Sequence, residues 1–295
     1  MTDKVALYGL GNMGYPVAQR VAQQFNVLVH DLDEERLAQA EQEFGAARIT
    51  APEDISNCRI IVLCLPHPSI SVAVIQSILP YLSDDAVVIE TSTVNPTDMH
   101  SYAAVFADHK AQIIDASILA GVSQMEAGTA TLALGGESDA VEAAQSVLNA
   151  IAEKQVYFGP LGTGAAAKVI NNAVAHAVMV VVAEAGAMAT ATGVDIDRLV
   201  GLLSDPEMGI HRPLTFRYAQ RVLNDDYEGG MPLDAARKDS ELALALAHSA
   251  GVPLFAVQAS HSVYEMGVGA GYGRDDYAAI AKLWSDWGKP TIPPK

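Results

Sequence analysis

Short apolar runs separated by longer segments organise the first half of the chain. The runs lie at Lys4–Gly9, Asn26–Asp31, Arg59–Leu65, Ala86–Ser92, Gln112–Ser117, Thr129–Gly136 and Gln155–Gly159. Most of the segments between them have room for one helix each. Near-continuous apolar strands that alternate with helices are typical of a parallel sheet covered on both faces. The pattern therefore predicts a doubly wound α/β sheet, joined mostly by right-handed crossovers.

The pattern changes at the glycine-rich segment Gly159–Gly164, which we interpret as a hinge. Beyond it, apolar residues recur at helical spacing and no convincing strand is found. The expected helices span Ala165–Thr192, Ile196–Leu203, Pro213–Asn224, Ala235–Ser249, Pro253–Val268 and Ala278–Trp287. We therefore predict an α/β domain over residues 1–162 and an all-helical domain over residues 163–295, joined by a long interdomain helix.

A glycine motif follows the first predicted strand and opens a helix. In this GxGxxG pattern the first glycine permits a tight turn, the second lets a pyrophosphate approach the backbone, and the third packs helix against strand. The helix amino terminus offers free N–H groups to the phosphates. We therefore interpret residues 1–162 as a Rossmann-type dinucleotide-binding domain, with a glycine turn that binds no nucleotide as the alternative. The cofactor-binding residues expected here are Gly9, Leu10, Gly11, Asn12, Met13 and Gly14.

Asp31 ends the second predicted strand, 20 residues after Gly11. A carboxylate at this position accepts hydrogen bonds from the ribose hydroxyls of NAD and repels the 2′-phosphate of NADP. The acidic residues of Asp33–Glu35 add to that repulsion. We therefore expect NAD as the cofactor, with NADP less favoured.

Lys168 and Asn172 lie four residues apart at the start of a long apolar stretch, so both side chains share one helix face. An ammonium and an amide on an alanine-rich surface indicate a pocket. When hydride reaches a carbonyl carbon, a lysine can protonate the oxygen and stabilise its negative charge. Burial would lower the pKa of such a lysine toward neutrality. The alternative is a lysine that extends from a core helix beside a capping asparagine.

Four motifs in order resemble the β-hydroxyacid dehydrogenase family, over nearly the whole chain. They are GLGNMG (Gly9–Gly14), DASILAGVSQMEAGT (Asp115–Thr129), GTGAAAKVINN (Gly162–Asn172) and KDSELALA (Lys238–Ala245). The resemblance implies that Lys168 is catalytic, that Asn172 assists it, and that Lys238 lies near cofactor and substrate. It also implies that Leu65 and Pro66 form a cofactor wall and that Thr93 contacts the nicotinamide ribose.

The chain departs from this family in the substrate loop, which usually reads DAPVSGG. Leu119 replaces the serine and Ala120 the first glycine, while Gly121 is retained. A leucine side chain cannot donate to a carboxylate, and alanine restricts the backbone. The departure puts a small hydroxy acid in doubt and leaves open a bulkier substrate, a less polar one, or one held by cations elsewhere. The substrate contacts we expect are Leu119, Ala120, Gly121, Ser123, Lys168, Asn172, Arg212 and Lys238.

These observations favour an NAD-dependent dehydrogenase that interconverts a 3-hydroxy acid, or a related primary alcohol, and its semialdehyde. Three alternatives stay open. Oxidative decarboxylation of 6-phosphogluconate belongs to a similar family, which carries His-Asn in place of Asn171-Asn172. Imine reductases usually have aspartate or tyrosine in place of Lys168. A non-catalytic dinucleotide sensor would need no proton donor.

The composition of the chain limits the kinds of molecule that it is expected to bind. The net charge of −17 and pI of about 4.7 argue against nucleic acid and anionic membranes. An anionic small-molecule substrate would be drawn in by a few local cations. Cys58 and Cys64 lie in or beside an apolar run, which indicates reduced thiols. No His, Cys and Asp cluster has metal-ligand spacing, so we expect no metal.

The remaining expectations concern location and assembly. The first residues have no signal-peptide layout, so we expect a cytoplasmic protein. The most apolar helix, near Ala173–Ala183, contains His176 and is followed by Glu184, which favours a buried core helix over a membrane span. His176 lies two helical turns from Lys168, and we expect it to be a core histidine with its hydrogen bonds satisfied. The long helix and the apolar second half indicate a homodimer or homotetramer.

Overall fold

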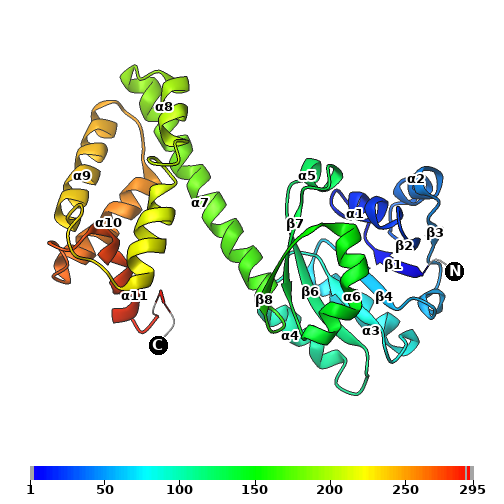
Figure 1. Cartoon of the computed structure of the whole chain (residues 1–295). Helices are drawn as coiled ribbons and strands as arrows, with labels where there is room; N and C mark the ends of the chain where they lie inside the picture. The colour runs from blue at the N-terminus through cyan, green and yellow to red at the C-terminus, as the bar shows by residue number, and fades with distance from the viewer. Residues whose placement is uncertain (1–2, 290, 293–295) are drawn as a thin grey trace. The chain divides into compact units, whose positions relative to one another are not determined.

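The computed structural model of the protein describes residues 3–289 and 291–292 (Figure 1). The chain divides into two compact units, Met1–Ala173 and Val174–Lys295. The division falls inside helix α7 (Thr163–Thr192), further along the chain than the predicted boundary between residues 162 and 163.

The first unit is built on one eight-stranded sheet. Its strands are β1 (Lys4–Tyr8), β2 (Asn26–His30), β3 (Ala47–Arg48), β4 (Ile60–Leu63), β5 (Val87–Glu90), β6 (Gln112–Leu119), β7 (Thr131–Gly135) and β8 (Lys154–Gly159). Their order is β3-β2-β1-β4-β5-β6-β7-β8, and the first six are parallel. This is the Rossmann order with two strands added at one edge. The predicted Rossmann-type fold is confirmed.

The edge of the sheet departs from a purely parallel arrangement. β7 runs antiparallel to β6, with Asp115 opposite Gly135, and β8 returns parallel to β7. The connection between β6 and β7 covers residues 120–130 and holds only the short helix α5 (Val122–Glu126). A parallel crossover needs about a dozen residues or more, so this connection reverses direction instead.

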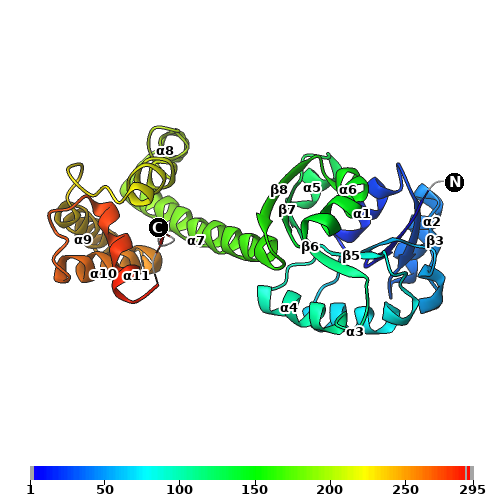
Figure 2. The ribbon, with the colours of Figure 1, turned by 60° about the horizontal axis from the view of Figure 1, so that its bottom comes forward.

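Helices cover both faces of the sheet, as Figure 2 shows. Helices α1 (Gly14–Val21), α2 (Glu34–Phe44) and α6 (Ser138–Ile151) pack on one face, and α3 (Pro68–Ile78) and α4 (Pro96–Val105) on the other. Side chains alternate between the two cores along each strand. On β1, Val5 and Leu7 enter the first core, and Ala6 and Tyr8 enter the second. Two short 3₁₀ turns, η1 (Pro52–Ile55) and η2 (Leu79–Tyr81), complete the unit.

The second unit is helical, as predicted. It contains α8 (Ile196–Leu203), a π-helical segment η3 (Pro213–Arg221), a 3₁₀ turn η4 (Val222–Asn224), α9 (Leu233–Ser249), α10 (Phe255–Gly269), η5 (Tyr277–Ala281) and α11 (Lys282–Asp286). Its core cluster is small and includes Tyr227, Leu233 and Ala279. The buried Asp276 carboxylate forms an ion pair with Arg217, whose Nε lies 3.1 Å from Asp276 Oδ1. The π form of η3 was not predicted.

Much of α7 is exposed in the described chain. Only 11% of its most apolar window is buried, and the exposed side chains include Ile170, Val174, Met179 and Val180. His176 is exposed as well. The predictions of a buried core helix and of a core histidine are therefore wrong for the single chain. By length and composition alone α7 could cross a membrane, a test that core helices of soluble proteins also pass.

Candidate active site

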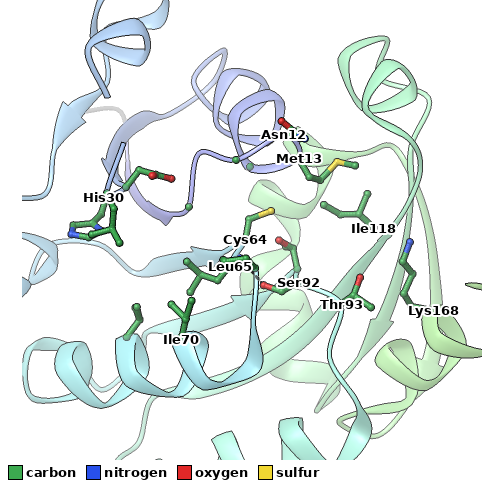
Figure 3. A pocket seen from close by; sticks show the side chains of 18 of the residues that line it. Asn12, Met13, His30, Cys64, Leu65, Ile70, Ser92, Thr93, Ile118 and Lys168 are labelled. Carbon is green, nitrogen blue, oxygen red and sulfur yellow. Dashed lines mark hydrogen bonds between the residues drawn. The ribbon is translucent and has the colours of Figure 1, made fainter. Parts of the chain in front are cut away.

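A cavity of about 690 Å³ lies in the first unit, where strands β1, β4, β5 and β6 end (Figure 3). Ligands of open α/β sheets bind at the carboxyl ends of the strands. Eleven of the residues that the sequence singled out line it: Gly9, Gly11, Asn12, Met13, Gly14, Asp31, Leu65, Pro66, Thr93, Ala120 and Lys168. His30 lies at one end of the cavity, and Lys168 with Thr93 at the other.

The three motif glycines have the geometry that a dinucleotide requires. Gly9 has a φ of +99°, and a Cβ there would lie 2.1 Å from the Cys64 carbonyl oxygen. A Cβ on Gly14 would lie 2.0 Å from the Gly9 carbonyl oxygen, so helix α1 packs closely against the turn. A Cβ on Gly11 would meet nothing within 4 Å, which leaves open space for a pyrophosphate.

Asp31 is held firmly beside this turn. Its carboxylate accepts hydrogen bonds from the backbone N–H groups of Leu10 and, at 2.9 Å, of Asp33. Leu10 is buried and does not line the cavity, so its part is to orient Asp31 through the backbone. The Leu32 side chain, 93% exposed, stands at the same end of the cavity and offers an apolar surface there.

The middle of the cavity wall is held by hydrogen bonds that the sequence did not reveal. Ser92 Oγ accepts from the Leu65 N–H at 2.7 Å, and Glu90 Oε1 accepts from the Ser92 N–H at 2.8 Å. Together they tie the loop after β4 to the loop after β5. Glu90 is fully buried, and this burial raises the pKa of its carboxyl group. The rise reflects the cost of holding a charge out of water. The sequence pointed to Leu65, Pro66 and Thr93 in this wall, but not to Ser92 or Glu90, which hold it.

Lys168 lies on the first turns of α7 and faces the cavity beside Thr93 and Ile118 (Figure 3). It is half-buried, and this burial lowers the pKa of its ammonium group. Its Nζ makes no hydrogen bond or ion pair within residues 3–289 and 291–292. Asn172 follows one turn later and does not line the cavity; its Oδ1 accepts from Asn171 Nδ2 at 3.4 Å.

The buried Asp115 fixes the start of α7. One carboxylate oxygen accepts from the Gly162 N–H and the other from the Ala165 N–H, both at 2.7 Å. A carboxylate at a helix amino terminus satisfies free N–H groups and interacts favourably with the helix dipole. Burial raises the pKa of Asp115, and these hydrogen bonds oppose that rise. The residue places Lys168, one turn after Gly164, at a fixed position relative to β6.

The substrate loop expected from the sequence is only partly in the cavity wall. Ile118 and Ala120 line the cavity, whereas Leu119, Gly121 and Ser123 do not. Alternate residues of a strand face opposite sides, so Ile118 and Ala120 share one side and Leu119 the other. Ile118 was not singled out by the sequence, although strand alternation would have found it.

The other expected cations belong to the second unit. Arg212 forms an ion pair with Glu207 at 3.6 Å, and Lys238 one with Asp239 at 3.0 Å. Both cysteines are free thiols, and burial raises the pKa of Cys64, at the cavity, to about 11. No group of three His, Cys, Asp or Glu side chains suited to a metal ion occurs among the residues that the structure describes.

Two family models match consecutive parts of the chain. The NAD binding domain of 6-phosphogluconate dehydrogenase matches residues 4–159, and the NAD-binding domain of NADP-dependent 3-hydroxyisobutyrate dehydrogenase matches residues 162–284. The chain belongs to the β-hydroxyacid dehydrogenase family. Family members are NAD(P)-dependent oxidoreductases that act on CH–OH groups, and the chain shares this type of activity.

Members of the β-hydroxyacid dehydrogenase family resemble the chain over almost its full length. A 2-(hydroxymethyl)glutarate dehydrogenase from Eubacterium barkeri is 27% identical over 95% of the chain and 94% of its own length. A 3-sulfolactaldehyde reductase from Escherichia coli (strain K12) is 28% identical over 94% of each. Among solved structures, an imine reductase from Pseudomonas sp. superposes with a TM-score of 0.82 at 24% identity, over 96% of the chain and 99% of its own. That likeness concerns the fold alone.

Proposed function

We propose that the protein is an NAD-dependent dehydrogenase that interconverts a 3-hydroxy acid, or a related primary alcohol, and its semialdehyde, with Lys168 as general acid and base. The observation that supports it best is the half-buried, unpaired Lys168 ammonium at one end of a cavity whose other end carries Asp31 and the glycine turn. The named relatives that act on hydroxy acids and aldehydes support the same reaction type.

When bound along the glycine turn, NADH would supply the hydride that reduces the carbonyl carbon. Lys168 donates a proton to the carbonyl oxygen as charge develops there, and solvent later restores the proton. In the direction of oxidation, the neutral amine accepts the alcohol proton. Asn172, one turn along α7, assists by hydrogen bonding without adding charge. Asp115 keeps the first turn of α7 in place during both directions.

NAD is the proposed cofactor because of the charges around Asp31. Its carboxylate is fixed by two backbone N–H groups, and the acidic residues Asp33, Glu34 and Glu35 follow Leu32 in the sequence. A phosphate on the ribose would be repelled by the Asp31 carboxylate. Imine reduction is the second candidate, favoured only by the likeness in fold to imine reductases. The Lys168 ammonium suits protonation of a carbonyl oxygen and keeps the dehydrogenase reaction first.

We also propose that the protein is a homodimer or homotetramer. The apolar side chains exposed on α7 are joined by others in the second unit, such as Leu242 on α9 and Phe255 on α10. A second copy would remove them from water. Sedimentation would then give at least twice the chain mass, and Met179→Glu would shift the protein toward monomer. A purely monomeric wild type would contradict the proposal.

The function is tested by following NADH absorbance with a panel of aldehydes and alcohols. For reduction, kcat/KM should fall as pH rises through the pKa of Lys168, because the donor is then deprotonated. Since burial lowers that pKa, the fall should begin below the range usual for lysine. For oxidation the profile should be the reverse. If NADH binds but no aldehyde or alcohol of the panel is turned over, the proposal is contradicted.

A further inference from the structure

We propose that Glu90 is a positioning residue of the active site, which acts on the reaction through the Thr93 hydroxyl group. The inference rests on the proposed function and adds a residue that does not itself line the cavity. Glu90 ends β5, and Thr93 lies in the loop that follows, where it lines the cavity. Because Thr93 lies beside Lys168 there (Figure 3), whatever fixes this loop also fixes the hydroxyl group relative to the proton donor.

The Thr93 hydroxyl group is available to a bound molecule. The side chain is exposed in the cavity and forms no hydrogen bond with any residue that the structure describes. The Lys168 ammonium beside it is unpaired in the same sense. Both groups can act on one bound molecule only at the right separation, and a shift of about 1 Å in an active site can cost about a hundredfold in rate.

Glu90 holds the loop through the backbone of Ser92. The Glu90 carboxyl group is fully buried, and its Oε1 accepts from the Ser92 N–H at 2.8 Å. The Ser92 hydroxyl group in turn accepts from the Leu65 N–H at 2.7 Å, which joins this loop to the one after β4. Without Glu90 Oε1 the buried Ser92 N–H would lose its acceptor. Since an unsatisfied buried donor is costly, the loop would move, and Thr93 would move with it.

A second buried carboxyl group holds Lys168 from the neighbouring strand. Glu90 on β5 lies opposite Asp115 on β6 in the parallel register, so the two side chains leave the sheet on the same face. Asp115 accepts from two N–H groups at the start of α7, the helix that carries Lys168. Glu90 thus sets the position of Thr93, and Asp115 that of Lys168, from adjacent places in one sheet. Support of this kind keeps the separation of two active groups constant.

The role assigned to Glu90 needs its oxygen as a hydrogen-bond acceptor and does not need its charge. No cationic side chain pairs with Glu90 in the described part of the chain. Glutamine keeps an acceptor oxygen on a side chain of the same length, whereas leucine keeps only an apolar side chain of similar size. Comparison of these two substitutions therefore separates the hydrogen bond from the packing.

The test is a double-mutant cycle on the full-length protein, with NADH and the aldehyde of the panel that the wild type reduces best. Thr93→Val and Glu90→Leu should each lower kcat/KM by about five- to tenfold, and Glu90→Gln by no more than about twofold. Because Glu90 acts through Thr93, adding Glu90→Leu to Thr93→Val should cost no more than about a further twofold. Two losses that multiply, or a Gln variant as slow as the Leu variant, would overturn the proposal.

Glu184→Leu is the matched control. Glu184 is a buried glutamate whose oxygens accept from the N–H groups of Ala256 and Val257 at the start of α10. It lies in the second unit and does not hold the Thr93 loop, so its effect on kcat/KM should multiply with that of Thr93→Val.

Glu90→Thr replaces Glu90→Leu if melting curves show that the leucine variant is unfolded. A threonine hydroxyl accepts only weakly from an N–H group two residues on, so kcat/KM should fall by about threefold, again with no further loss beside Thr93→Val. A loss that multiplies would overturn the proposal here too. A wild type that binds NADH and reduces no aldehyde would instead contradict the proposed function, so the two failures are distinguishable.

Discussion

The two ends of the cavity are built in opposite ways. At the end near Asp31, the carboxylate is held by the N–H groups of Leu10 and Asp33, so its position is fixed before any ligand arrives. At the other end, the Lys168 ammonium has no partner within the described residues and lies beside Thr93 and the apolar Ile118. The first end is suited to binding one fixed chemical group, and the second to transferring a proton.

The largest effect should come from removing the unpaired amine. Lys168→Ala should lower kcat by about a hundredfold or more while leaving NADH affinity nearly intact, as expected for a general acid. Steady-state kinetics and NADH fluorescence titration measure the two quantities. Lys154→Ala, which removes an exposed lysine at the start of β8, is the control. A Lys168 variant of undiminished rate would refute the catalytic role.

The fixed end should respond more mildly. Asp31→Ala should narrow the preference for NAD over NADP by about tenfold, because a repelling carboxylate and a ribose acceptor are lost together. The ratio of kcat/KM values for NADH and NADPH measures this effect. Asp108→Ala removes an exposed carboxylate elsewhere in the unit and should leave the ratio unchanged. If Asp31→Ala leaves it unchanged too, the adenosine end is misassigned.

A smaller effect is expected at Leu119. Its neighbours Ile118 and Ala120 line the cavity and it does not, so Leu119→Ser should improve the use of small carboxylate-bearing aldehydes by only about twofold. Steady-state kinetics with malonate semialdehyde and NADH measure this gain. A gain of about tenfold or more would show that Leu119 reaches the substrate.

The smallest effect on activity should come from Glu90→Gln, which keeps the acceptor for the Ser92 N–H. Burial raises the pKa of Glu90 in the folded protein, so its contribution to stability is present at low pH and is lost as pH rises through that pKa. Wild type should therefore lose thermal stability relative to the variant as pH rises. Melting curves at several pH values measure this difference, and parallel curves would contradict a raised pKa of Glu90.

The sequence predicted the elements best where local pattern and burial agree. Each strand of the parallel sheet except the two-residue β3 was found, and the ends differ by a few residues. The antiparallel direction of β7 relative to β6 was missed, because the apolar pattern of a buried strand does not indicate which way the strand runs. The core position of α7 was wrong because an apolar stretch does not reveal whether its own chain covers it.

For the site, the sequence located the residues with distinctive chemistry but not those that hold them. Asp31 and Lys168 line the cavity, and their roles remain predictions. The parts of Glu90 and Asp115 depend on hydrogen bonds between segments distant in sequence, such as that from Gly162 to Asp115.

Because Asp115 joins β6 to the beginning of α7, the amine and the cavity wall are set by the same strand. A Cβ on Gly164 would come within 2.7 Å of the Asp115 carboxylate, so this junction tolerates little change. The wall residues Ile118 and Ala120 lie just beyond it. A directed-evolution library confined to these two positions would thus change the cavity wall while Lys168 keeps its position. The residues at the end of β6 are therefore suited to altering which aldehydes the protein accepts.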